Sequence, residues 1–202
     1  MKSAVKRMIS TSLVMYRKRG SGDLHLTFDD GPHPENTPII LEILERHSAG
    51  ATFFLQGDQV ERHPGLVKEI CRRGHAVGSH LFSHRSPKEM STGDLGNEME
   101  RTEGVLRDAA GVAVRWVRPP YGDLTVGLLW RTIRRRQSVV LWSFDSEDSF
   151  LLSREQIFGK VSQGHFRTGD ILLFHEDCRH TVEALPRIMD LLAARGYNLA
   201  SL

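Results

Sequence analysis

Residues 24–32, Leu24-His25-Leu26-Thr27-Phe28-Asp29-Asp30-Gly31-Pro32, form a short alternating stretch that ends in two carboxylates and a turn. Apolar side chains at every second position indicate a strand with one buried face. The alternation stops at Asp29-Asp30, and Gly31-Pro32 predicts a turn. Two carboxylates that face one pocket repel each other unless a cation neutralises them. The stretch therefore predicts either a metal site or a solvated turn, and partners elsewhere in the chain decide between them.

Composition indicates an ordinary soluble chain with one full-sized core: 202 residues, of which 40% are hydrophobic and 26% charged. The net charge of +2, without a basic stripe interleaved with aromatics, argues against a nucleic-acid partner. Cys71 and Cys178 form no C-x-x-C motif, and we expect two reduced thiols, with a single bridge as the alternative. No apolar run reaches about 18 residues, so no membrane span is expected.

Residues 1–21 are treated as a basic N-terminal segment ahead of a single domain at 22–202. Its apolar residues Val5, Ile9 and Leu13 share one helical face. We predict an amphipathic helix packed on the domain, with weak contact to a membrane surface as the alternative. The segment is a poor secretory signal, because polar residues interrupt its apolar part and no small-residue cleavage site follows. A cytoplasmic protein is expected, and a membrane-associated or exported one is the alternative.

From residue 24 onward, strand patterns alternate with helix patterns. Strands are predicted at 24–28, 51–55, 76–79, 112–117, 138–144, 170–174 and 197–202. Helices are predicted from 37 up to Gly50 and at 64–73, 94–110, 124–136, 153–163 and 185–195. Seven strands alternating with six helices predict a parallel β/α architecture, either an open sheet or a barrel.

Polar residues that can take part in chemistry end at least five of these strands. They are Asp29-Asp30, His80, Arg118, Asp145 and His175. In a barrel these strand ends meet at one mouth, whereas an open sheet would spread them along an edge. The barrel is therefore favoured. Since the chain is shorter than the ~250 residues of a full barrel, we predict a distorted, incomplete one with about seven parallel strands.

His80 and His84 are the second candidate for metal binding. A spacing of four places two histidines on one side of a helical turn, although surface or capping histidines show the same spacing. The pair follows a strand directly, at the end where Asp29-Asp30 lies, and this position favours a metal. Two histidines and one carboxylate leave one coordination position open, as in catalytic zinc sites. Only one aspartate is needed as a ligand, and the other can act as general base.

Three further groups complete the predicted site. Arg118 is the expected partner that keeps the base ionised and oriented, the alternative being a surface arginine. Since proline lacks an N–H, the backbone amide of Tyr121 is the free donor in the following loop and a candidate oxyanion contact. His175 can protonate a leaving group, with Asp145 or Asp148 holding its ring. Alternatively, His175 belongs to a solvated polar loop with Glu176.

These motifs, in this order, resemble the polysaccharide deacetylase family, the NodB-homology enzymes of carbohydrate esterase family 4. The resemblance covers roughly residues 24–202. It rests on Thr27-Phe28-Asp29-Asp30-Gly31-Pro32, His80-x-x-x-His84, Arg118-Pro119-Pro120-Tyr121-Gly122, Asp145-x-x-Asp148 and Leu173-x-His175.

The resemblance implies a distorted β/α barrel and a divalent metal, zinc being expected and cobalt, nickel or manganese possible. It implies removal of acetyl groups from N-acetylglucosamine units in chito-oligosaccharide, chitin-like or peptidoglycan-type saccharides. An O-acetyl esterase on xylan-type sugar and a silent saccharide-binding relative are the alternatives. The implied roles are base for Asp29, metal ligands for Asp30, His80 and His84, tether of the base for Arg118, general acid for His175 and its support for Asp145.

We expect the substrate to contact Tyr121, Leu173, Pro120 and Trp142, with Leu173 against the acetyl methyl group. The sequence departs from the family at one position. The family usually has tryptophan directly after the second aspartate of Asp-x-x-Asp, but Ser149-Phe150 follows Asp148 here. Phe150 or Trp142 is the candidate replacement for that wall of the acetyl pocket. The departure bears on pocket shape and substrate choice rather than on the class of reaction.

Overall fold

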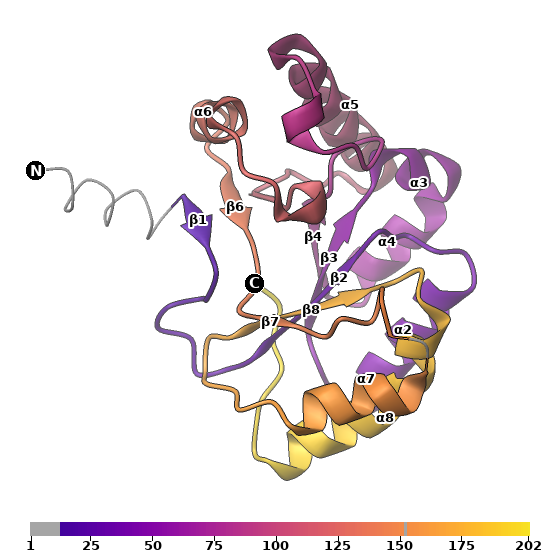
Figure 1. Ribbon diagram of the computed structural model, residues 1–202. Coiled ribbons are helices and arrows are strands. Elements are labelled where there is room, and N and C mark those ends of the chain that lie inside the picture. The colour runs from indigo at the N-terminus through magenta and orange to yellow at the C-terminus, as the bar shows by residue number, and fades with distance from the viewer. Residues whose placement is uncertain (1–12, 152) are drawn as a thin grey trace, which may run out of the picture.

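The computed structural model describes residues 13–151 and 153–202. Within them, eight strands form one sheet in the order β1-β6-β5-β4-β3-β2-β8-β7, and every pairing between its strands is parallel (Figure 1). The strands are β1 (Val14–Met15), β2 (His25–Asp29), β3 (Ala51–Leu55), β4 (Ala76–Ser79), β5 (Trp116–Val117), β6 (Ser138–Val140), β7 (Phe144–Asp145) and β8 (Ile171–His175). The predicted parallel β/α architecture is confirmed.

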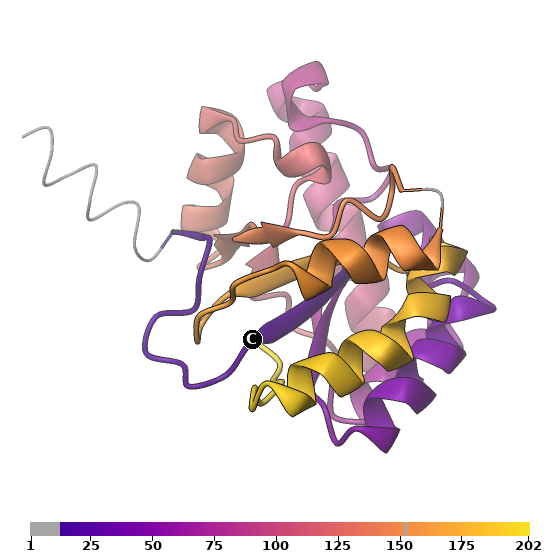
Figure 2. The same cartoon turned by 60° about the horizontal axis from the view of Figure 1, so that its bottom comes forward.

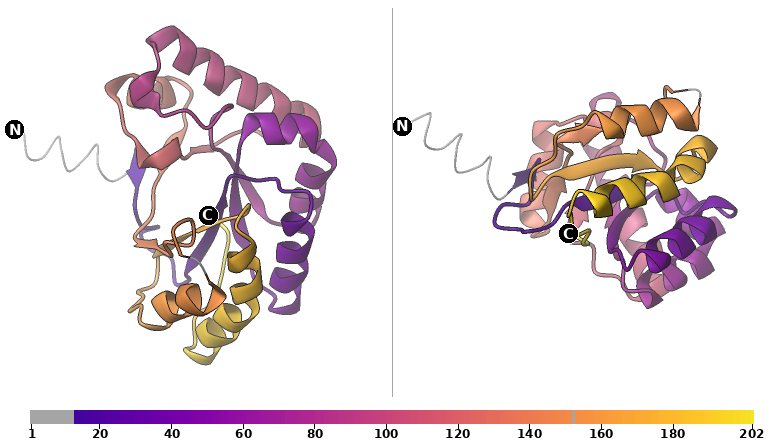
Figure 3. Two further views of the ribbon diagram at one scale, coloured as in Figure 1. Left: turned by 45° about the vertical axis from the view of Figure 1, so that its right-hand side comes forward. Right: turned by 90° about the horizontal axis from the view of Figure 1, so that it is seen from below.

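The sheet is curled, because β6 and β7 lie near opposite ends of its order yet follow each other in the chain. Residues 141–143 link the two strands, and a link of that length spans about 14 Å at most. The Leu141 N–H donates to the Met15 carbonyl and the Ser143 N–H to the Ile171 carbonyl, so the link passes from one side of the sheet to the other. The helices lie on the outside (Figures 2 and 3). This is the distorted, incomplete barrel that the sequence predicts.

The helices follow the strands along the chain. They are α2 (Asn36–Arg46), α3 (Gly57–Arg62), α4 (Pro64–Arg72), α5 (Thr92–Ala110), α6 (Val126–Arg134), α7 (Arg154–Ser162) and α8 (Arg179–Ala194), with 3₁₀ turns η1 (Pro87–Glu89) and η2 (Pro120–Gly122). Ser91, Thr125 and Ser153 cap α5, α6 and α7 by accepting a backbone N–H with their side chains.

The main core lies between the outer face of the sheet and the helices. On β2, Phe28 points to this side, and its ring centroid lies 5.3 Å from that of Phe53 and 5.9 Å from that of Phe174. Thr27, the neighbour of Phe28 along β2, contacts Arg118 on the inner side of the sheet. Every residue of β2 is buried, as expected for a parallel strand covered on both faces.

The prediction of a last strand at 197–202 is wrong. The C-terminal segment forms only an isolated bridge, between Leu199 and Leu24, and the N–H of Leu202 donates to the side chain of Thr52. The backbone of the segment bonds to Leu24, just before β2, and to Gly50, just before β3, and these few bonds do not extend into a strand ladder. The strand predicted at 138–144 is divided into β6 and β7, since residues 141–143 carry the chain across the barrel. Only the last two residues of the strand predicted at 112–117 are paired.

The helix predicted for residues 1–21 lies mainly outside the described residues, and its described part, from residue 13, contains β1 instead. Val14 and Met15 pair with Val139 and Val140, because the exposed edge of β6 offers hydrogen bonds that a helix there would leave unmade. Among the helices of the described residues, none is long and apolar enough to cross a membrane.

Two helices differ from the prediction. The sequence did not predict α3, and its N-terminal turn proves important for the site. Helix α8 begins at Arg179 rather than Leu185, so Pro186 lies in its interior and not in its first turn. Proline there leaves one backbone carbonyl without its helical N–H partner, but the helix continues because seven of its side chains are buried.

Candidate active site

Asp29 ends β2, and Asp30 follows it with a φ of 70°. This left-handed conformation, which residues other than glycine seldom adopt, turns the backbone out of the strand. The two adjacent carboxylates therefore do not point to opposite faces, and both line one pocket of about 680 Å³ at the carboxyl ends of the strands. Asp29 is only 3% exposed. The interpretation as a solvated turn does not fit this burial.

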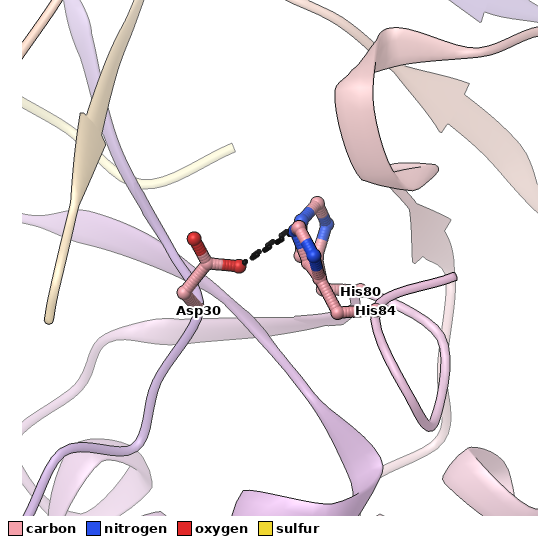
Figure 4. A group of neighbouring side chains, drawn as sticks. All are labelled: Asp30, His80 and His84. Atoms are coloured by element: carbon pink, nitrogen blue, oxygen red, sulfur yellow. Dashed lines mark ion pairs between the residues drawn. The ribbon is translucent and has the colours of Figure 1, made fainter. Parts of the chain in front are cut away.

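Asp30 lies beside His80 and His84 (Figure 4). Its Oδ1 is 3.4 Å from Nε2 of His80 and 3.2 Å from Nε2 of His84. Nδ1 of His80 donates to the carbonyl of Arg118 at 2.8 Å, which leaves the lone pair on Nε2. Three donor atoms from two separate strand ends thus converge on one point.

The two histidines meet through a loop, and the predicted helical turn is wrong. The described residues 80–84 are not helical, and His84 has a φ of 57°. Glu98 of α5 fixes this loop by accepting the backbone N–H groups of Phe82 and Ser83 at 2.9 and 2.8 Å. Two backbone N–H groups of the loop are therefore satisfied by a carboxylate of the α-helix that follows, a contact that local sequence patterns do not reveal.

The three side chains fit a divalent metal ion. In a tetrahedral zinc site, bonds of about 2.0–2.1 Å place the donor atoms about 3.3 Å apart. The Asp30–His80 and Asp30–His84 separations agree with that value, and all three donor atoms lie within 4.8 Å of one another. Two imidazole nitrogens and one carboxylate oxygen leave a fourth position open for water or substrate.

The pKa shifts of Asp30 and His80 suit a bound cation, whereas the shift of His84 means that its ring must lose a proton to bind one. Burial raises the pKa of Asp30, but the hydrogen bond with His84 and the charge of His80 outweigh it and hold the pKa well below its usual range. Burial lowers the pKa of His80, whereas the hydrogen bond with Asp30 raises the pKa of His84. The site thus offers an ionised carboxylate and a neutral ring at His80, the forms that bind metal.

Arg118 is fully buried and holds Asp29 in place. Its Nη1 donates to Oδ1 of Asp29 at 2.7 Å and to the hydroxyl of Thr27 at 2.8 Å. Its Nε and Nη2 donate to the backbone carbonyls of residues 140 and 141 at 3.2 and 3.1 Å. Burial lowers the pKa of Arg118, and the charge of Asp29 opposes this effect. Oδ2, the second oxygen of Asp29, lies 3.9 Å from Nε2 of His80.

His175 ends β8 and is held by Asp148. Nδ1 of His175 donates to Oδ1 of Asp148 at 2.7 Å, and the backbone N–H of His175 donates to Oδ2 at 2.8 Å. The hydroxyl of Thr181 donates to the same Oδ2. Burial lowers the pKa of His175, but the bond to Asp148 and the nearby carboxylates outweigh it and raise the pKa to about 9.

Asp145, which the resemblance assigned to this role, does not support His175. In the pairing of β7 with β8, Asp145 lies opposite Leu173, two residues short of His175. Oδ1 of Asp145 accepts the N–H of Glu147 in the turn that follows, and this turn carries Asp148 up to His175. The sequence allows either aspartate beside His175, and in the structure the contact is made by Asp148. Asp145 still lines the pocket.

The pocket wall contains Tyr121, Trp142 and Leu173, whereas Pro120 is buried behind it and Pro119 lines the pocket instead. The ring of Tyr121 lies edge-on to that of His84, with centroids 4.9 Å apart.

Phe150 lines the same pocket but is 79% exposed, so it lies at the rim. The ring of Trp142 packs on Gly122, where an added Cβ would lie 2.9 Å from it. Of the two candidate replacements for the family tryptophan, Trp142 is therefore a packed part of the wall.

Glu176, grouped with a solvated loop in the sequence analysis, is instead fully buried. It accepts the hydroxyl of Thr37, and its Oε2 has no hydrogen-bond partner among the described residues. This oxygen lies 1.6 Å from the position of a Cβ on Gly31, so only glycine fits at that turn. Burial raises the pKa of Glu176 to about 8. A neutral acid thus packs under the turn that carries Asp29 and Asp30.

Comparison with known proteins supports the resemblance. The family model for polysaccharide deacetylases matches residues 16–135, more than half of the chain. The matched part contains the candidate residues Asp29, Asp30, His80, His84 and Arg118.

Two relatives of the chain bear the names of deacetylases, in agreement with the family model. A peptidoglycan-N-acetylglucosamine deacetylase of Bacillus cereus is 34% identical over 184 residues, which are 89% of this chain and 66% of that protein. A chitooligosaccharide deacetylase of Rhizobium leguminosarum bv. trifolii is 32% identical over 215 residues, covering 98% of this chain and 99% of the relative. The chain thus spans just under two thirds of the first protein and nearly all of the second.

A solved structure extends the likeness to the fold. The crystal structure of the Bc1960 peptidoglycan N-acetylglucosamine deacetylase, in complex with a naphthalenyl N-hydroxybenzamide, matches with a TM-score of 0.89 at 31% identity. The match covers 99% of this chain and 94% of that chain. The curled barrel described above is therefore shared over its full extent.

Proposed function

The chain belongs to the polysaccharide deacetylase family, and we propose that it is a metal-dependent hydrolase that removes acetyl groups from N-acetylglucosamine units of a saccharide. One observation carries the proposal. The ligand set Asp30–His80–His84, the tethered carboxylate of Asp29 and the imidazole of His175 all line a single pocket. These are the groups that amide hydrolysis needs: a Lewis-acid site, a base and an acid.

A divalent ion, zinc in our proposal, held by Asp30, His80 and His84 would polarise the acetyl carbonyl and acidify the attacking water. Asp29 acts as general base and accepts a proton from that water. Because Oδ1 of Asp29 is engaged by Arg118, Oδ2 is the oxygen available for this proton. The backbone N–H of Tyr121 stabilises the negative charge that develops on the carbonyl oxygen.

His175 acts as general acid. With a pKa raised to about 9, its ring is protonated at neutral pH. It donates a proton to the sugar nitrogen as the C–N bond breaks, so that the nitrogen leaves as an amine. The water oxygen remains on the acetyl carbon, and acetate is the second product. Leu173, 3% exposed and on the pocket wall, contacts the acetyl methyl group.

Acetate release from purified protein tests the substrate class. An N-acetylglucosamine oligomer and a peptidoglycan fragment are compared with an acetylated xylan under the same conditions. The proposal predicts release from the N-acetylated saccharides. Release from xylan alone would assign the site to O-acetyl esters, and release from none of them would make the chain a silent saccharide-binding relative.

A further inference from the structure

Gln56 contacts the candidate metal ligand Asp30 directly. It follows β3 and occupies the N-cap position of α3. Its side-chain Nε2 donates to Oδ1 of Asp30 at 2.8 Å. This is the same oxygen that lies 3.4 and 3.2 Å from the Nε2 atoms of His80 and His84. The ligand oxygen is therefore held from one side by an amide while the histidines face it from another.

The backbone at the start of α3 fixes Gln56 relative to both segments that carry ligands. The N–H of Gln56 donates to the carbonyl of Gly31, next to Asp30, at 2.9 Å. The next N–H, of Gly57, donates to the carbonyl of Leu81 in the histidine loop at 2.8 Å. A Cβ on Gly57 would lie 2.4 Å from the ring of Phe82, so the close approach requires glycine. One short turn thus ties the aspartate turn to the histidine loop.

The side-chain amide of Gln56 is a suitable hydrogen-bond donor to a metal-ligating carboxylate oxygen. The cation nearest the paired aspartates, Arg118, is bonded to Asp29. Gln56 therefore supplies Asp30 with a neutral donor that does not compete with a metal ion for the charge of the carboxylate. A carboxylate oxygen has two lone pairs, so Oδ1 can accept from Gln56 and still bind a metal. Partners of this kind orient ligands and affect metal affinity.

We propose that Gln56 is a positioning residue, whose amide holds the ligand oxygen of Asp30 where it can bind a metal together with His80 and His84. The inference rests on the proposed metal site and adds a residue that neither the sequence motifs nor the family resemblance singled out. Its role lies in metal affinity rather than in folding, because the backbone bonds of the α3 turn do not depend on the side chain.

The test compares Gln56→Met with Gln59→Met. Methionine keeps the length of the side chain and removes the donor, and Gln59 lies on the same short helix without a bond to the ligand set. Zinc affinity is measured by competition with a chromogenic chelator, and the thermal midpoint is measured on the metal-free proteins. We expect Gln56→Met to bind zinc about 10–100-fold more weakly. Gln59→Met should bind zinc with the affinity of the wild type. The metal-free wild type and both metal-free variants should have the same thermal midpoint.

Measuring kcat as a function of zinc concentration distinguishes a positioning role of Gln56 from a general loss of activity. Gln56→Met should recover most of its kcat at saturating zinc. Wild-type zinc affinity in Gln56→Met would overturn the proposal. A failure of the wild-type protein to bind zinc would contradict the proposed function itself. Should Gln56→Met fail to fold, Gln56→Asn replaces it, because its amide is one methylene too short to reach Asp30. Wild-type affinity in Gln56→Asn would likewise overturn the proposal.

Discussion

Nδ1 of His175 donates to Oδ1 of Asp148 at 2.7 Å, and Asp148 in turn accepts the backbone N–H of His175 and the hydroxyl of Thr181. The carboxylate thus fixes both the tautomer and the orientation of the ring. Nε2 of His175 is the nitrogen left for the pocket. This arrangement suits the general-acid role that we propose for His175, with its pKa raised by Asp148.

The first prediction contrasts the two aspartates of the Asp-x-x-Asp motif. Asp148→Asn removes the charge that keeps His175 protonated, and kcat should fall by about 10²–10⁴. Asp145→Asn changes a pocket residue that does not touch His175, and kcat should stay close to that of the wild type. Steady-state acetate release measures both. A greater loss in Asp145→Asn than in Asp148→Asn would contradict the assignment.

The second prediction concerns pH. The general acid must be protonated, so kcat/KM should be high below the pKa of His175 and should fall as pH rises through about 9. In Asp148→Asn the main opposition to burial is lost, and only the charges of Asp29 and Asp30 still raise the pKa of His175. The pKa should therefore fall, and the alkaline limb should move to lower pH. An alkaline limb at the same pH in both proteins would show that another group controls it.

The third prediction concerns Glu176 and stability. Its pKa is raised from 4.5 to about 8, so the unfolded chain loses this proton at lower pH than the folded protein. The wild-type free energy of unfolding should therefore decrease as pH rises from about 4.5 to 8. Glu176→Gln has no such proton, so its stability relative to the wild type should be about 3–4 kcal/mol more favourable at pH 8 than at pH 5. Urea denaturation at the two pH values measures this. An equal difference between variant and wild type at both pH values would show that Glu176 does not titrate in this way.

The fourth prediction concerns the buried pair of Arg118 and Asp29. Arg118→Met leaves a buried carboxylate without its cation and should cost about 3–5 kcal/mol of stability, together with activity. Arg134→Met, on the exposed face of α6, is the matched control and should change neither. Chemical denaturation and acetate release are measured on both variants. If Arg118→Met keeps wild-type activity, the arginine is not needed to orient the base.

Much of the site could be predicted from the sequence because strand periodicity and strand ends are local. Alternation up to Phe28 located the end of β2, and with it Asp29 and Asp30. Parallel strands then bring their carboxyl ends together, which placed His80 and His175 in the same pocket. The curled sheet followed from the number of strand ends that carry polar residues.

What the sequence missed depends on tertiary contacts. The choice of Asp148 over Asp145 is set by the register of β7 on β8 and by the turn after it, which no spacing reveals. Glu98 shapes the histidine loop from α5, the next α-helix along the chain. Glu176 appeared solvated because it stands among charged residues, yet the loop after β8 folds it under Gly31. Val14 and Met15 pair with the edge of β6 as a strand, although the spacing of Val5, Ile9 and Leu13 predicts a helix for this segment.

We propose that a metal ion held by Asp30, His80 and His84 activates the water that Asp29 deprotonates. Acetate release from an N-acetylglucosamine oligomer tests it most directly, measured on wild type and Asp29→Asn after chelation and again after zinc is restored. In the wild type, chelation should abolish acetate release and zinc should restore it. Asp29→Asn should bind zinc with the same stoichiometry and release no acetate. Release that persists through chelation, or full activity in Asp29→Asn, would contradict it.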